Sequence, residues 1–190
     1  MKIIDNVREI LKDDLASAKQ KNSQVAIAAS YFSIYAYQEL KAQLTNIKEL
    51  KFIFTSPSFT TEKAKKEKRE FYIPQLNREK SLYGTEFEVK LRNELTQKAI
   101  AKECAEWVRR KATFKTNITQ ENMSGFINVK NDNASYTYMP VNGFTTVDIG
   151  CEKGNNIYNM VNRFEAPYTD AYFKLFDEVW NNKEKLQDVT

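Results

Sequence analysis

The side chains that could do chemistry in this 190-residue chain include no histidine. Histidine has the ordinary pKa nearest neutrality and serves as nucleophile, general base and metal ligand. Its absence excludes Ser-His and Cys-His catalytic pairs, phosphohistidine intermediates and the commonest zinc sites. Chemistry would rest on carboxylates, lysine, tyrosine or the two cysteines, Cys104 and Cys151. Neither thiol lies in a cluster of Cys and His residues of the kind that holds zinc, so we expect no metal site and a cytoplasmic location.

Basic residues are concentrated in the middle of the chain. Residues 61–116 carry 15 Lys and Arg against 9 Asp and Glu, although the net charge of the whole chain is only +4. Around Lys80 the cations alternate with aromatic residues, and Arg109 and Arg110 follow further along. Such a zone suits a polyanion such as DNA, because each phosphate contact releases counterions. A solvated surface of mixed charge is the open alternative, since acidic residues are interspersed.

The pattern of apolar residues predicts the elements that must position these groups. A short apolar run, a capped helix and a second apolar run form a β-α-β unit, whose two strands we expect to be parallel. The strands are expected at Val25–Ala29, Leu50–Phe54, Ala112–Thr116, Gly125–Lys130, Ser135–Met139 and Phe144–Ile149. The helices are expected at Ile3–Lys19, Ser33–Leu44, Glu86–Lys111, Asn155–Phe164 and Tyr168–Trp180. This order predicts an α/β fold with a mixed central sheet flanked by helices. No apolar run approaches the length that spans a bilayer, so no membrane partner is expected.

Five sequence blocks are long and distinctive: Ala28–Tyr35, Phe52–Pro57, Lys68–Pro74, Ala99–Ala105 and Asn142–Asp148. Together they resemble the N-terminal region of large bacterial DEAD/DEAH-box helicases of the Swi/Snf type. These helicases place a phospholipase D-like domain before their ATPase lobes. The resemblance implies that residues 1–182 form a phospholipase D-like half-domain and that residues 183–190 begin a linker toward the helicase lobes. It also implies that ATP and Mg²⁺ belong to those lobes, with no cofactor in this part.

The phospholipase D-like family carries His-x-Lys, then Asp, then Gly-Ser-x-x-Asn. In this chain Asn128-Val129-Lys130 stands in place of His-x-Lys, Asn142 in place of the Asp, and the degraded last motif ends at Asn155. The Lys130-to-Asn142 interval requires an insertion near residues 131–136. The resemblance therefore implies that the phosphodiesterase reaction is lost. Asn128, Lys130, Asn142 and Asn155 would still hydrogen-bond a phosphate.

Three functional hypotheses follow. The first is a non-catalytic accessory domain of an ATP-dependent helicase, which binds DNA through Lys80, Arg109, Arg110 and Lys130 or organises the protein as a dimer. The second is a residual phosphodiesterase or nuclease that uses Lys130, Cys151 or a metal in place of histidine. The third is a pure interaction module that docks on the helicase lobes or on a second copy of itself. The homodimer is expected because family members pair two halves.

Overall fold

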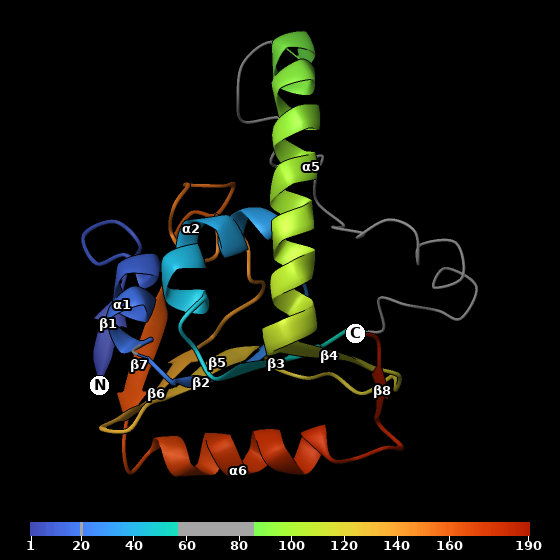
Figure 1. Cartoon of the computed structure of the whole chain (residues 1–190). Helices are drawn as coiled ribbons and strands as arrows, with labels where there is room; N and C mark the ends of the chain where they lie inside the picture. Colours follow the sequence, from blue (N-terminus) through green and yellow to red (C-terminus); the bar gives the residue numbers. More distant parts are fainter. Residues whose placement is uncertain (20, 57–85) are drawn as a thin grey trace.

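The computed structural model describes residues 1–19, 21–56 and 86–190, with the stretch 86–97 described through its backbone alone. One eight-stranded mixed sheet lies between two helical layers, α1, α2 and α5 on one face and α6 on the other (Figure 1). The strands are β1 (Lys2–Ile4), β2 (Gln24–Ala29), β3 (Glu49–Phe54), β4 (Ala112–Asn117), β5 (Phe126–Lys130), β6 (Ser135–Met139), β7 (Val161–Glu165) and β8 (Leu186–Asp188). The helices are α1 (Leu11–Ala18), α2 (Ile34–Leu44), α5 (Glu86–Lys111) and α6 (Thr169–Trp180). The predicted α/β class with a mixed, helix-flanked sheet is confirmed.

The strands follow the order β1-β7-β6-β5-β2-β3-β4-β8, in which β2, β3 and β4 are parallel to one another. The expected β-α-β unit is β2-α2-β3. Its helix begins where the Ser33 hydroxyl accepts a hydrogen bond from the Tyr35 amide at 3.1 Å. A hydroxyl in that position satisfies an amide that the first helical turn leaves without a partner. The helix α5 then leads into β4, and its amino-terminal part rises steeply away from the sheet (Figure 1).

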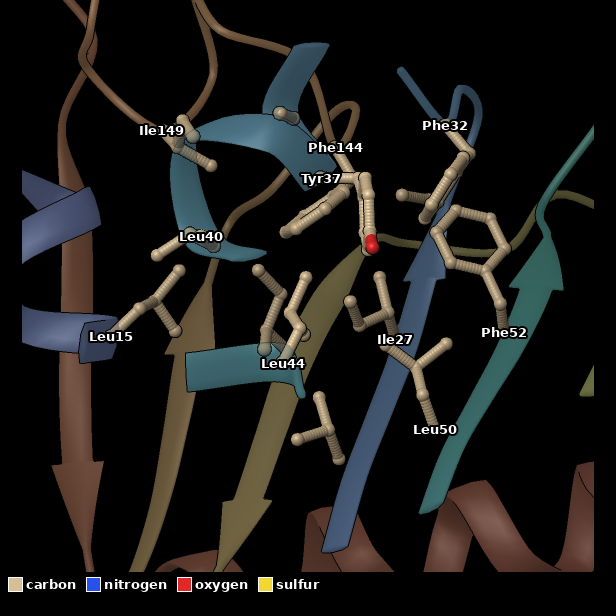
Figure 2. Packing of buried hydrophobic residues seen from close by; sticks show 14 of the residues in the cluster. Leu15, Ile27, Phe32, Tyr37, Leu40, Leu44, Leu50, Phe52, Phe144 and Ile149 are labelled. Carbon is tan, nitrogen blue, oxygen red and sulfur yellow. The ribbon is translucent and has the colours of Figure 1, made fainter. Parts of the chain in front are cut away.

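Two apolar cores hold the layers together. The larger lies between the sheet and α1, α2 and α5, and Figure 2 shows Leu15, Leu40 and Ile27 converging there from three elements. Phe32 packs its ring against those of Phe52, Phe114 and Phe144, with ring centroids 5.2–5.6 Å apart. The smaller core lies between the sheet and α6 and contains Ala28, Ile53, Phe126, Phe176, Trp180 and Leu186. The alternation of apolar residues along β2 and β5 serves both cores, because successive side chains point to opposite faces.

The expected helix Ile3–Lys19 is wrong in its first half. Residues 2–4 form β1 at the sheet edge, and α1 begins only at Leu11. Between them the Asp5 carboxylate accepts the amides of Val7, Arg8 and Glu9 at 2.8–3.1 Å. A side chain that binds local amides in this way competes with the helical hydrogen bonds. The helical spacing of the apolar residues is coincidental here, since the Val7 side chain is 80% exposed.

Two further predicted elements are wrong, and the reason is again the hydrogen bonds of polar side chains. Residues 144–149 are a turn in which only Phe144 makes a single bridge, to Phe32. The Thr145 hydroxyl donates to Asp148 and fixes that turn. The segment 155–164 is a loop followed by β7, in place of the expected helix. There the Asn159 side-chain amide donates to the Val147 carbonyl at 3.0 Å, and hydrogen bonds of this kind replace those of a helix.

The segment 183–190, expected to begin a linker, contributes a strand. Residues Leu186–Asp188 form β8, which pairs antiparallel with β4 through Asn117 and Lys115. Leu186 is 6% exposed and packs in the smaller core. This stretch therefore belongs to the same sheet as the rest of the described chain.

Candidate functional site

The four residues matched to the phospholipase D-like motif do not meet in one pocket. Lys130 ends β5, where it pairs with Gln24 at the start of β2. Asn142 lies after β6, and its carbonyl accepts the amide of Ser30 just beyond the end of β2. The two residues therefore lie at opposite ends of β2, because β6 runs back along β5. Asn155 is exposed in the loop before β7.

Residues 131–134, in the stretch where the motif match requires an insertion, form a tight hairpin connection between β5 and β6. Lys130 pairs with Ser135 across it. The Asn131 side-chain oxygen accepts the amides of Asn133 and Ala134, both at 2.8 Å, and its amide donates to the Ala18 carbonyl at 3.1 Å. An Asn that binds the backbone two residues on is a common way to close a turn. The hairpin therefore places Lys130 rigidly beside the carboxyl end of α1.

Asn128 is completely buried and lies on the sheet face that α6 covers, two residues after Phe126. Its side-chain oxygen accepts the Thr137 hydroxyl at 2.8 Å, and its amide nitrogen has no hydrogen-bond partner in the described residues. A ligand in solution cannot reach this amide in the structure. Asn128 thus has the surroundings of a core residue, although the motif predicts a phosphate ligand.

The cations predicted to bind nucleic acid, unlike the motif residues, lie partly together in the structure. Lys80 lies outside the described residues. Arg109 and Arg110 are exposed in the last turn of α5, directly before β4 begins. Leu50 of β3 pairs with Ala112 of β4, and the residue before Leu50, Glu49, pairs with Gln24, which pairs with Lys130. Arg109, Arg110 and Lys130 consequently lie along one side of the sheet, where the parallel strands have their amino ends and β5 has its carboxyl end. We call this line of strand ends one edge of the sheet.

This edge gathers further cations from two connections that precede β2 and β3. The Asn22 amide donates to the Asn46 carbonyl at 3.0 Å, and the Lys48 amide donates to the Ser23 carbonyl at 2.8 Å. The ammonium of Lys111 crosses to the Ile47 carbonyl at 2.8 Å. The two connections and the end of α5 are thereby tied together. We call the resulting set the basic rim: Lys21, Lys48, Arg109, Arg110, Lys111 and Lys130.

The basic rim carries an excess of positive charge. None of its six cations forms an ion pair with a carboxylate in the described part of the chain. The stretches 21–24, 46–49, 109–112 and 130–135 contain only two carboxylates, Glu49 and Asp132. Like charges held close together raise the local potential and attract polyanions, most strongly at low salt. Five of the six cations are exposed, and Lys111 is partly so.

The sequence alone indicates half of this rim. It predicts Arg109, Arg110 and Lys130 as nucleic-acid ligands and does not include Lys111 among them. It misses Lys21 and Lys48 because both lie outside the basic middle of the chain, residues 61–116. A possible signal is their position, since each shortly precedes one of the two strands predicted to be parallel.

A second charged cluster, around Asp14, is not indicated by the sequence. Asp14 is 8% exposed, and its carboxylate accepts hydrogen bonds from Lys2 and Tyr138 at 2.8 Å and from Arg163 at 3.1 Å. Burial raises the pKa of this carboxyl, but the three donors outweigh burial and lower it overall. The cluster ties β1, α1, β6 and β7 together. Because its buried carboxylate is satisfied by these donors, we assign it a structural role.

The remaining candidates for catalysis have unsuitable surroundings. Burial raises the pKa of the Cys104 thiol to about 12 and that of Cys151 to about 11, so neither is a thiolate at neutral pH. The part of the chain that the structure describes contains no group of three His, Cys, Asp or Glu residues able to hold a metal ion. A groove of about 310 Å³ runs beside α6, with a mainly apolar floor that includes Phe126 and Tyr172. At its margin Lys185 and Glu121 form an ion pair at 2.5 Å.

The comparisons with known proteins give no family. No protein-family model matches the chain, and neither does any curated protein. Across residues 1–19, 21–56 and 86–190, none of the helices combines the length and apolar character needed to cross a membrane.

Proposed function

We propose that this domain binds the phosphate backbone of nucleic acid through the basic rim and performs no catalysis itself. The observation that carries the proposal is the set of six cations, from four separate stretches of chain, that share one edge without an ion-pair partner among the described residues. Each phosphate that such a cation neutralises releases condensed counterions, which favours binding. Arg and Lys groups of this kind position nucleic acid without reading its sequence.

The role of an accessory domain to a helicase forms part of the same proposal. It rests on the sequence blocks that resemble helicase N-terminal regions and on the mixed, helix-flanked sheet expected of a phospholipase D-like half-domain. Under this proposal the domain supplies DNA affinity, whereas ATP and Mg²⁺ act in the helicase lobes of the same chain. Under this proposal the outer face of α6 and the β1 edge stay available for contacts with those lobes or with a second copy.

Residual phosphodiesterase activity is the less favoured alternative on geometric grounds. The Cys151 thiol lies near Lys12, at the start of α1, whereas Lys130 precedes Asn131, which binds the last residue of α1. A helix of eight residues, about 12 Å long, thus separates the two groups. A nucleophile and the group that assists it must lie within hydrogen-bond reach. Lys130 and Cys151 therefore do not form a catalytic pair.

The first test is the salt dependence of DNA binding, measured by fluorescence anisotropy with a labelled duplex of about 20 base pairs. Replacing Arg109, Arg110 and Lys130 by Gln should weaken binding and lower the slope of log K against log salt by about 2 to 3, since each lost contact contributes about 0.9. The matched control replaces three exposed lysines elsewhere, Lys153, Lys174 and Lys183, by Gln. It removes the same charge and should leave the slope nearly unchanged.

Two outcomes would contradict the proposal. Either the chain fails to retain duplex or single strands at about 20 mM salt, or both triple variants lower the slope equally. In the second case net charge alone would explain the binding. If DNA binding is absent and light scattering shows a stable dimer, the interaction module becomes the favoured function. Turnover of labelled oligonucleotide that Lys130→Ala abolishes would instead favour the phosphodiesterase.

A further inference from the structure

We infer that the basic rim binds the backbone of a double helix and discriminates against single strands. This inference rests on the proposed function, and it concerns which form of DNA the same surface accepts. The two forms are bound by different means. Proteins that bind single strands combine positive charge with aromatic side chains on which the bases stack. Backbone recognition of a duplex needs cations at fixed positions, because the duplex is itself a regular and stiff polyanion.

The rim offers fixed positions. Its cations come from the ends of β5, β2, β3 and β4, which are neighbours in the sheet. Adjacent strands lie about 4.8 Å apart, so the rim extends for about 15 Å from Lys130 to the end of α5. Along a duplex axis this length covers about four phosphates of each strand. The hydrogen bonds Asn22 to Asn46, Lys48 to Ser23 and Lys111 to Ile47 hold the cation-bearing connections together.

Within the part of the chain that the structure describes, the four stretches of the rim offer no ring on which a base could stack. The four stretches 21–24, 46–49, 109–112 and 130–135 contain no aromatic residue. Among the described residues the strongly exposed aromatic side chains are Tyr158, at 76%, and Tyr168, at 73%. Tyr158 lies in the loop before β7, at the opposite end of the strands from Lys130. The next residue in this loop, Asn159, accepts the Asn6 side-chain amide through its carbonyl.

Tyr168 is the aromatic residue that could extend the rim, and its neighbours make it unsuitable. It precedes Thr169, whose hydroxyl lies 2.6 Å from that of Ser135 across the hairpin from Lys130. Two exposed carboxylates, Glu165 and Asp170, flank it in the sequence. Glu165 is paired with the Arg163 guanidinium at 2.7 Å, so Asp170 supplies the charge that repels a phosphate chain running from Lys130 toward the tyrosine ring. The positive surface therefore continues from Lys130 toward α5 and not toward Tyr168.

The experiment compares a duplex of about 20 base pairs with each of its separated strands, and with oligo-dT of the same length, at about 50 mM salt. A duplex carries twice the charge per unit length of its axis, so we expect it to bind at least about fivefold more tightly than any single strand. Tyr168→Ala should leave all of these affinities within about twofold of the wild type. Arg109→Gln with Arg110→Gln should weaken the duplex most.

The outcomes separate the inference from the proposed function. Equal or tighter binding of single strands, or a loss of more than about fivefold in single-strand affinity on Tyr168→Ala, overturns the duplex preference. If the rim variants still weaken that single-strand binding, the proposed function stands. If none of the probes binds, the proposed function fails and the inference fails with it. Circular dichroism of each variant establishes that it is folded before its affinity is compared.

Discussion

At the scale of single residues, two buried charges show how differently the fold treats them. The Asp14 carboxylate meets three donors, of which Lys2 of β1 and Arg163 of β7 are cations. The Lys19 ammonium is also buried but has no hydrogen-bond partner in the described residues; it lies over the Phe144 ring, 5.4 Å from its centroid. A buried charge is tolerated when it is paired and is costly when it is not. The two sites should therefore respond to mutation in opposite directions.

Replacing Lys19 by Met should stabilise the protein at neutral pH. Burial lowers the pKa of Lys19 from 10.5 to about 7, so the unfolded chain binds more protons than the folded one between those two values. Stability of the wild type should consequently rise as the pH increases from about 7 to about 8.5, and at a pH of about 6 the variant should be about 3 to 5 kcal/mol more stable. Urea unfolding at several pH values measures both effects. A wild-type stability that is flat over this range would contradict the burial of Lys19.

Replacing Asp14 by Asn should destabilise the protein by about 3 kcal/mol, because it leaves Arg163 and Lys2 without their common partner. The pKa of Asp14 is lowered on folding, so its contribution is present above the ordinary pKa of 3.8 and is lost as the pH falls through the folded value. The neighbouring Asp13 is exposed, and Asp13→Asn serves as the control. Equal urea midpoints for the two variants at neutral pH would show that the cluster is not structural.

At the scale of elements, polar side chains decide where the regular structure begins and ends. The Asn6 side-chain oxygen accepts the Leu11 amide at 2.8 Å at the start of α1, and its amide donates to the Asn159 carbonyl beside β7. A single residue thereby shortens a predicted helix and fixes the loop that replaces another. At the other end of the chain, the Thr190 hydroxyl bonds both the amide and the carbonyl of Phe114 in β4, which anchors the stretch that contains β8.

The strand β8 provides the element-scale prediction. Leu186→Ala should cost about 2 to 3 kcal/mol of stability, because it removes a side chain from the small core under α6. Gln187 is exposed and pairs with Thr116 only through the backbone, so Gln187→Ala should change stability by less than about 0.5 kcal/mol. Thermal unfolding of both variants decides. If Leu186→Ala leaves the stability unchanged, the segment does not contribute to the folded domain and the expectation of a linker is favoured.

At the scale of the whole molecule, the two ends of the parallel strands carry different kinds of polar group. The amino ends of β2, β3 and β4 bear the basic rim, whereas the carboxyl end of β2 bears hydroxyl and amide groups such as the Ser30 to Thr55 hydrogen bond at 2.9 Å. The protein presents these cations on one edge and joins its layers through apolar cores elsewhere. Under the proposed function, a polyanion would bind at these strand ends and leave the packed interior undisturbed.

Binding at the rim should therefore stabilise the folded state as a whole. A duplex present at about 100 times its dissociation constant should add about 2.7 kcal/mol to the free energy of unfolding. The effect should disappear at about 0.5 M salt and in the Arg109, Arg110 and Lys130 triple variant. Differential scanning fluorimetry with and without duplex measures it. Stabilisation that persists at high salt would point to a non-electrostatic contact away from the rim.

Local sequence determined much of the fold. The apolar runs of β2 and β3, the Ser33 cap and the long α5 follow from neighbouring residues, and the predicted bounds agree with the observed ones within a residue or two. The elements predicted wrongly, at residues 3–10, 144–149 and 155–164, depend on distant or competing polar contacts such as Asn6 with Asn159. Apolar spacing cannot reveal these contacts.

The candidate site divides in the same way. Composition located the cations of α5, and the lack of histidine by itself excluded whole classes of catalysis. Only the tertiary structure brought Lys21 and Lys48 to Arg109, Arg110 and Lys130, because strand register places residues far apart in the sequence on one edge. It also buried Asn128 and separated Lys130 from Asn142, since β6 runs antiparallel to β5 and takes the chain to the opposite end of the strands.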